Sequence, residues 1–125
     1  MQRENTGMLT IETVPVPTGS KPVHVVRIDV PRLTEDSGLD EIRSQILALD
    51  SEKAGADVLI DLSPAEFLSS AALGMLGMIH RKIWAAKGRL KLCGIRPEIM
   101  QIFAVTKLDN LFDIHDTRES GLASF

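Results

Sequence analysis

A short, wholly apolar run, Val58-Leu59-Ile60, constrains the fold of this chain more than any other segment. A strand with one face in water alternates apolar and polar residues, and this run has no polar residue among its members. It therefore predicts a central strand whose two faces are both buried. Such a strand needs other elements of the chain to cover its sheet on either side.

Two further strands are expected before this run. Residues 8–14 alternate apolar and polar side chains, which is the period of a half-buried strand. Residues 23–30 are rich in β-branched side chains and predict a second strand. The intervening segment 15–22 holds Pro and Gly, so the two strands are expected to form a hairpin with a longish loop. The polar residues 1–7 are expected to be a flexible tail.

Helices and strands are expected to alternate over the rest of the chain. Helices are predicted by apolar side chains at helical spacing, and strands by short apolar or β-branched runs. In chain order these elements are helix 39–54, strand 58–60, helix 71–86, strand 89–93, helix 96–108 and strand 112–115. The complete order β-β-α-β-α-β-α-β indicates an α/β fold, with a mixed β-sheet covered by helices and right-handed parallel crossovers.

Composition and charge limit the classes of partner. The 125 residues carry 14 Lys and Arg against 17 Asp and Glu, whereas binding to nucleic acid needs clustered positive charge. Residues 1–7 lack the apolar core of a signal peptide. The longest apolar run, 71–79, has about half the length of a membrane span. We therefore expect one cytoplasmic domain that binds no nucleic acid and does not insert in a membrane.

Residues that support metal binding or cofactor binding are scattered along the sequence. His24, His80 and His115 show no ligand spacing with one another or with the single cysteine, Cys93, so no metal site is predicted. Cys93 itself lies in a strand-like context and is expected to be a small core residue. The glycines of segment 74–77 lie inside a predicted helix and not in a phosphate-binding loop. They are expected to let that helix approach the sheet closely.

A small serine hydrolase is an alternative, because Ser69 and Ser70 lie at a predicted strand-to-helix turn. The residues around them lack the glycines of a hydrolase nucleophile elbow, and no acid–histidine pair follows at a suggestive position. Asp61 ends the central strand as the phosphoacceptor of a receiver domain does. The first strand, however, offers only Glu12 for the acidic pair that would hold magnesium. No catalytic residue and no cofactor is predicted.

Three segments together resemble the STAS domain family. Residues 61–74 read Asp-Leu-Ser-Pro-Ala-Glu-Phe-Leu-Ser-Ser-Ala-Ala-Leu-Gly. They are similar to the family signature, which is an Asp-Leu strand end, an aromatic-apolar pair and then Asp-Ser-Ser/Thr/Ala-Gly-Leu-Gly. Residues 88–97 resemble the family's next strand and the start of the helix after it. Residues 102–114 resemble that helix and the closing strand.

This resemblance implies a STAS domain at residues 8–118, with a STAS-type mixed β-sheet and helices packed mainly on one face. A flexible tail is expected at 1–7 and a C-terminal tail at 119–125. The implied function is partner switching in the control of transcription. In such systems an anti-sigma factor that is also a serine kinase phosphorylates its antagonist. The unphosphorylated antagonist binds the anti-sigma factor and frees the sigma factor, and a phosphatase resets the cycle.

Carried over residue by residue, the family signature gives Ser70 as the phosphorylation site, with Ser69 as its competitor. Ser69 stands where the family usually has Asp, Ala71 stands at the second hydroxyl position, and Ala72 replaces a Gly. A serine at a helix start is first of all a capping residue. A phosphate at the same place suits the helix dipole. The implied partner-binding residues are Leu33, Thr34, Leu68, Ser69, Ser70, Ala71, Leu73 and Gly74.

Two alternatives stay open within the family. The changes at positions 69 and 72 are compatible with a STAS scaffold that is not phosphorylated at this loop. A free-standing STAS subunit of a transport complex is the other.

Overall fold

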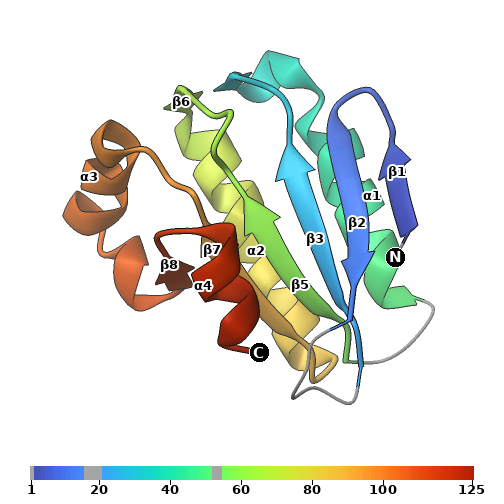
Figure 1. Cartoon of the computed structure of the whole chain (residues 1–125). Helices are drawn as coiled ribbons and strands as arrows, with labels where there is room; N and C mark the ends of the chain where they lie inside the picture. The colour runs from blue at the N-terminus through green and yellow to red at the C-terminus, as the bar shows by residue number, and fades with distance from the viewer. Residues whose placement is uncertain (1, 16–20, 52–54) are drawn as a thin grey trace.

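The fold is built on a six-stranded mixed sheet, seen in a computed structural model that describes residues 2–15, 21–51 and 55–125 (Figure 1). The strands, in their order across the sheet, are β1 Gln2–Asn5, β2 Leu9–Val14, β3 Val23–Ile28, β5 Asp57–Asp61, β7 Arg89–Cys93 and β8 Asp113–His115. β1, β2 and β3 pair antiparallel, whereas β3, β5, β7 and β8 pair parallel. The predicted α/β fold with a mixed sheet is confirmed.

Most of the helices cover one face of this sheet. Their bounds are η1 Glu35–Ser37, α1 Leu39–Ser51, α2 Ser70–Ala85, α3 Pro97–Val105, η2 Leu108–Asn110 and α4 Arg118–Ala123, where η marks a 3-10 turn. α1 and α2 lie behind the sheet in Figure 1, and the buried side chains of α3 belong to the same core. α4 lies on the opposite face, against β5 and β7.

The central strand β5 is buried from both sides, as its apolar run predicts. Val58 and Ile60 point into the large core beneath α1, α2 and α3, and both are inaccessible to solvent. Leu59 points the other way, into a smaller cluster beneath α4. The buried members of that cluster are Val23, Val25, Leu59, Cys93 and Phe125. The burial of Cys93 confirms it as a core residue and raises the pKa of its thiol to about 12.

The two tails expected at the ends of the domain are wrong. Residues Gln2–Asn5 pair with β2 as an edge strand. Residues 119–125 hold most of α4, and the ring of Phe125 is packed with an exposed fraction of 9%. Gly121 fits against Leu59 so closely that a Cβ atom there would stand 2.8 Å from Leu59 Cδ1. The C-terminal segment is therefore part of the fold.

The end of the third helix also differs from the predicted one. The third helix stops at Val105 instead of 108, because Lys107 adopts a left-handed conformation with φ of 62° and Leu108 begins a separate 3-10 turn. The middle of the predicted loop, 16–20, and the predicted end of the first helix, 52–54, lie outside the described residues.

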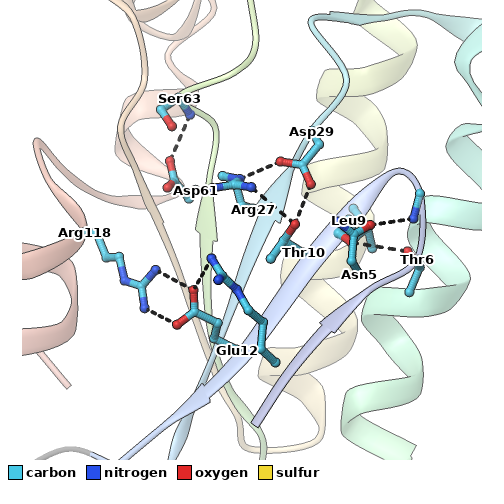
Figure 2. Close-up of polar contacts among 12 residues, drawn as sticks. Asn5, Thr6, Leu9, Thr10, Glu12, Arg27, Asp29, Asp61, Ser63 and Arg118 are labelled. Atoms are coloured by element: carbon cyan, nitrogen blue, oxygen red, sulfur yellow. Dashed lines mark hydrogen bonds and ion pairs between the residues drawn. The ribbon is translucent and has the colours of Figure 1, made fainter. Parts of the chain in front are cut away.

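An ion pair joins α4 to β2 on the same face of the sheet (Figure 2). The guanidinium of Arg118 donates two hydrogen bonds to the carboxylate of Glu12 on β2, at 3.1 and 2.9 Å. The Glu12 side chain is only 13% exposed, and Arg3 of β1 adds a second cation at 3.5 Å. The hydrogen bond from Arg118 lowers the pKa of Glu12. Glu12 is therefore a structural anion, and it ties Arg118 at the start of α4 to β2.

Truncation of the central strand should be costly. Ile60→Ala is expected to lower the free energy of unfolding by about 2–5 kcal/mol, because it removes a buried side chain and leaves a cavity. The matched control is Val105→Ala on α3, where the side chain is 83% exposed and the loss should stay below about 0.5 kcal/mol. Urea denaturation measures both. Equal losses in the two variants would contradict the central position of β5.

The side chain of His80 should make stability depend on pH. Its ring packs edge-on against Phe112 with centroids 5.4 Å apart, and Nδ1 is buried without a hydrogen-bond partner among the described residues. Burial lowers the pKa of His80 from its ordinary 6.5. Protonation therefore favours the unfolded chain, and stability is lost as the pH falls below about 6.5.

The free energy of unfolding should accordingly drop more between about pH 7 and about pH 5 in the wild type than in His80→Leu, which cannot titrate there. Chemical denaturation at the two pH values measures the difference. Identical pH dependence in the two proteins would refute the role of His80.

Candidate functional site

Two loops at the carboxyl ends of the parallel strands are joined to each other by a small sheet. β4 Arg32–Leu33 follows β3, β6 Phe67–Leu68 follows β5, and the two pair parallel (Figure 1). Outside this pairing, the backbone N–H of Ser69 donates to the carbonyl of Leu33 at 2.9 Å. The chain that enters α2 is thereby fixed to the loop that precedes α1.

The side chains of these two strands divide into a buried and an exposed pair. Leu33 is inaccessible and Leu68 is 3% exposed, so both support the site from within the core. Their neighbours Arg32 and Phe67 face outward, with the Arg32 guanidinium 4.7 Å from the centre of the Phe67 ring. Sequence reasoning named the two leucines as contact residues and missed the exposed pair, although strand alternation was the signal that places them outside.

Ser69 is the capping residue of α2. Its backbone is extended, and its hydroxyl oxygen accepts a hydrogen bond from the N–H of Ala72 at 3.2 Å. This satisfies one of the free N–H groups at the start of the helix. Asp is an equally good capping residue, so serine at this position keeps the function of the usual family residue. The structure therefore gives Ser69 a local stabilising role.

Ser70, the first residue of α2, is exposed. Its hydroxyl makes no hydrogen bond with the described part of the chain. Because Ser69 already caps the helix, the Ser70 hydroxyl is left accessible beside the positive end of the helix dipole. The two serines, adjacent in sequence, thus have different surroundings.

An open groove lies beside Ser70, between α2 on one side and η1 and α1 on the other. Its volume is about 520 Å³. The lining residues are Glu35, Gly38, Leu39, Asp40, Arg43, Ala71, Gly74, Met75 and Met78. Thr34 caps η1 with its hydroxyl oxygen, which accepts from the N–H of Asp36, and so fixes one end of the groove. Leu73, on the neighbouring face of α2, packs against the large core.

Gly74 and Gly77 do not bring α2 close to the sheet, and that expectation is wrong. A Cβ atom placed on either residue would meet nothing within 4 Å. The close contacts to the sheet come from other positions of α2, such as Leu76 and Ile79, which are fully buried. Gly74 instead leaves bare backbone on an exposed surface next to the groove.

Asp61 at the end of β5 stabilises a turn. Its carboxylate accepts a hydrogen bond from the N–H of Ser63 at 2.9 Å, as Figure 2 shows. Gly94 after β7 lies so near that a Cβ atom there would stand 2.7 Å from Asp61 Oδ1, and Arg96 donates to the carbonyl of Ser63. The loops after β5 and β7 are thereby tied together beneath the site.

The described residues contain neither a metal-binding cluster nor a membrane-spanning helix. Within residues 2–15, 21–51 and 55–125, no three His, Cys, Asp or Glu side chains gather so as to hold a metal ion. No helix in the same ranges has both the length and the apolar character to cross a bilayer.

Comparisons with known proteins agree with this fold. The profile of the STAS domain family matches residues 21–121. BtrV of Bordetella bronchiseptica, named as an anti-sigma factor antagonist, is 27% identical over 79 residues, which cover 63% of this chain and 68% of BtrV.

Two solved structures superpose on most of the chain. One is an anti-sigma factor antagonist (STAS) domain protein from Planctomyces limnophilus, with 27% identity, a TM-score of 0.72 and coverage of 82% of this chain and 88% of the other. The second is SpoIIAA of Bacillus in its phosphorylated form, with 19% identity, a TM-score of 0.65 and coverage of 91% and 96%. At 19% identity, the similarity to SpoIIAA shows a shared fold.

The expected STAS-type sheet is therefore confirmed, and the profile match runs from the start of β3 into α4. This chain belongs to the STAS domain family.

Proposed function

We propose that this protein is an anti-sigma factor antagonist that acts by phosphorylation-controlled partner switching. The observation that carries the proposal is that the two serines at the start of α2 have different roles. Ser69 caps the helix, and the hydroxyl of Ser70 stays exposed and without a hydrogen bond to the described residues. A kinase therefore has access to Ser70 without breaking the cap. The similarity to relatives that are named as anti-sigma factor antagonists supports this choice.

The domain itself tolerates a phosphate on Ser70. Phosphorylation adds about −2 charge at the helix N-terminus, where the dipole and the unpaired N–H groups favour an anion. The modification therefore leaves the fold unchanged and acts on whatever is docked there. A partner surface pressed against Ser70 would have to strip water from the dianion, which is strongly unfavourable.

The proposed partner is an anti-sigma factor with serine-kinase activity, and a phosphatase reverses the modification. Both are cytoplasmic in this scheme, and the antagonist itself performs no catalysis. The contact surface consists of side chains that the structure leaves wholly or partly exposed, supported from below by the buried Leu33 and Leu68. These contact residues are Thr34, Ser69, Ser70, Ala71, Leu73 and Gly74.

The departures from the family signature do not weaken the site physically. Ser69 replaces Asp but still caps α2, and Ala72 lies fully buried where a side chain larger than Gly fits. The second candidate, a scaffold or transport-complex subunit without phosphorylation, rests on those departures at positions 69 and 72, together with the alanine at position 71 that removes the second hydroxyl. The presence or absence of phosphate on Ser70 distinguishes the two functions.

Mapping of the phosphorylated residue is the first test. The purified chain is incubated with ATP and the serine-kinase anti-sigma factor of the same genome, and the modified peptide is identified by mass spectrometry. We expect phosphate on Ser70, none in Ser70→Ala, and wild-type incorporation in Ser69→Ala. Phosphate solely outside residues 69–70, or no incorporation at all, would favour the scaffold instead.

The two serines should also differ in their effect on stability. Ser69→Ala is expected to lower the free energy of unfolding by about 1 kcal/mol, because it removes the hydrogen bond to the Ala72 N–H. Ser69→Asp should retain most of the stability, since Asp caps as well as Ser. Ser70→Ala should change it by less than about 0.5 kcal/mol. Urea titration tests the series, and a larger loss at position 70 than at 69 would reverse the assignment.

A further inference from the structure

The groove between α2 and the η1–α1 segment has apolar side chains among its lining residues. Leu39, Met75 and Met78 line it, and methionine side chains adapt to different shapes of ligand. Ala71 and Gly74 contribute little bulk on the α2 side. An apolar group entering the groove would contact these three side chains and, at Gly74, the bare backbone of α2.

The rim of the groove is acidic. Glu35 and Asp40 line the groove against one cation, Arg43, and the same segment, 35–43, also carries Asp36 and Glu41. Arg43 is already engaged with Asp40 at 3.3 Å and with the sulfur of Met78 at 3.6 Å. The other three carboxylates are on exposed residues and have no ion-pair partner in the described part of the chain. The complementary occupant therefore carries Lys or Arg next to its apolar side chain.

Gly74 gives the strongest sign that the groove is meant for another molecule. A glycine inside a helix destabilises it by comparison with alanine. No contact among the described residues requires this one, because a Cβ atom at position 74 would lie in open space. A side chain there would, however, project from α2 at the groove that Gly74 lines. Glycine keeps this space free.

We propose that the groove binds an apolar side chain of the anti-sigma factor, on a segment with flanking Lys or Arg residues. This inference rests on the proposed function and names the contact by which it works. Ser70 lies one helical turn before Gly74, so it stands at the entrance of the groove. A phosphate on Ser70 places a strongly hydrated dianion at that entrance. Desolvating it costs more than exposed ion pairs with the basic flank return, and binding is lost.

The test compares two glycines of α2, one of which lines the groove while the other lies outside the lining. Gly74→Leu fills the entrance, whereas Gly77→Leu adds the same side chain one turn later, outside the lining. Both should fold, since a Cβ atom at either position meets nothing within 4 Å. Affinity for the purified serine-kinase anti-sigma factor is measured by titration calorimetry. We expect at least about a tenfold loss for Gly74→Leu and less than about a twofold change for Gly77→Leu.

A charge reversal tests the rim in the same assay. Glu35→Lys should weaken binding, and added salt should reduce the difference from wild type. Glu98→Lys on α3 makes the same change of charge away from the groove and should have no comparable effect.

The outcomes separate the groove from the switch. Suppose that the wild type binds the anti-sigma factor and that phosphorylation of Ser70 abolishes this binding, but that Gly74→Leu binds normally. The proposed binding in the groove is then refuted, and the proposed function stands. An equal loss of affinity in Gly74→Leu and Gly77→Leu also refutes binding in the groove, because it shows a general perturbation of α2. If the wild type does not bind the anti-sigma factor at all, both proposals fall.

Discussion

Two-sided burial of β5 is the constraint on which the rest of the structure depends. Its apolar residues belong to two different cores, so the strand must stand in the middle of the sheet with cover on both faces. β3 and β7 flank it in parallel, and their carboxyl ends meet its own at one edge. That edge brings the loops after β3, β5 and β7 together. The position of the site is thus a consequence of how the core is packed.

The start of α2 combines rigidity with access. The pairing of β4 with β6 and the cap provided by Ser69 fix the backbone, and neither involves the Ser70 hydroxyl. A modification of Ser70 therefore leaves the internal hydrogen bonds intact and changes only the surface. α2 serves both requirements, because one face carries buried apolar side chains and the other exposes Ser70 and Gly74. Access to the Ser70 hydroxyl therefore requires no rearrangement of the backbone.

The sequence specified the features that rest on local chemistry or on the period of apolar residues. The run at 58–60 predicted a central strand, the alternation in 8–14 predicted a half-buried one, and the order of elements predicted the mixed sheet. Ser69 and Ser70 were recognisable as a helix start because capping depends on neighbours three residues away. The apolar stripe of the third helix predicts an end at residue 108, beyond the observed end at Val105. Nothing in that stripe indicates the left-handed conformation of Lys107.

Only the tertiary structure decided features whose partners are remote in sequence. Residues 2–5 are polar and form a strand because β2 offers them an edge, and α4 is held by a contact between Arg118 and Glu12, 106 positions apart. Exposure at the site also had to come from the fold: Leu33 and Leu68 are buried, and the groove exists only where η1 and α1 meet α2. Periodicity and capping act within a few residues, whereas burial and grooves arise from surfaces that meet only after the chain has folded.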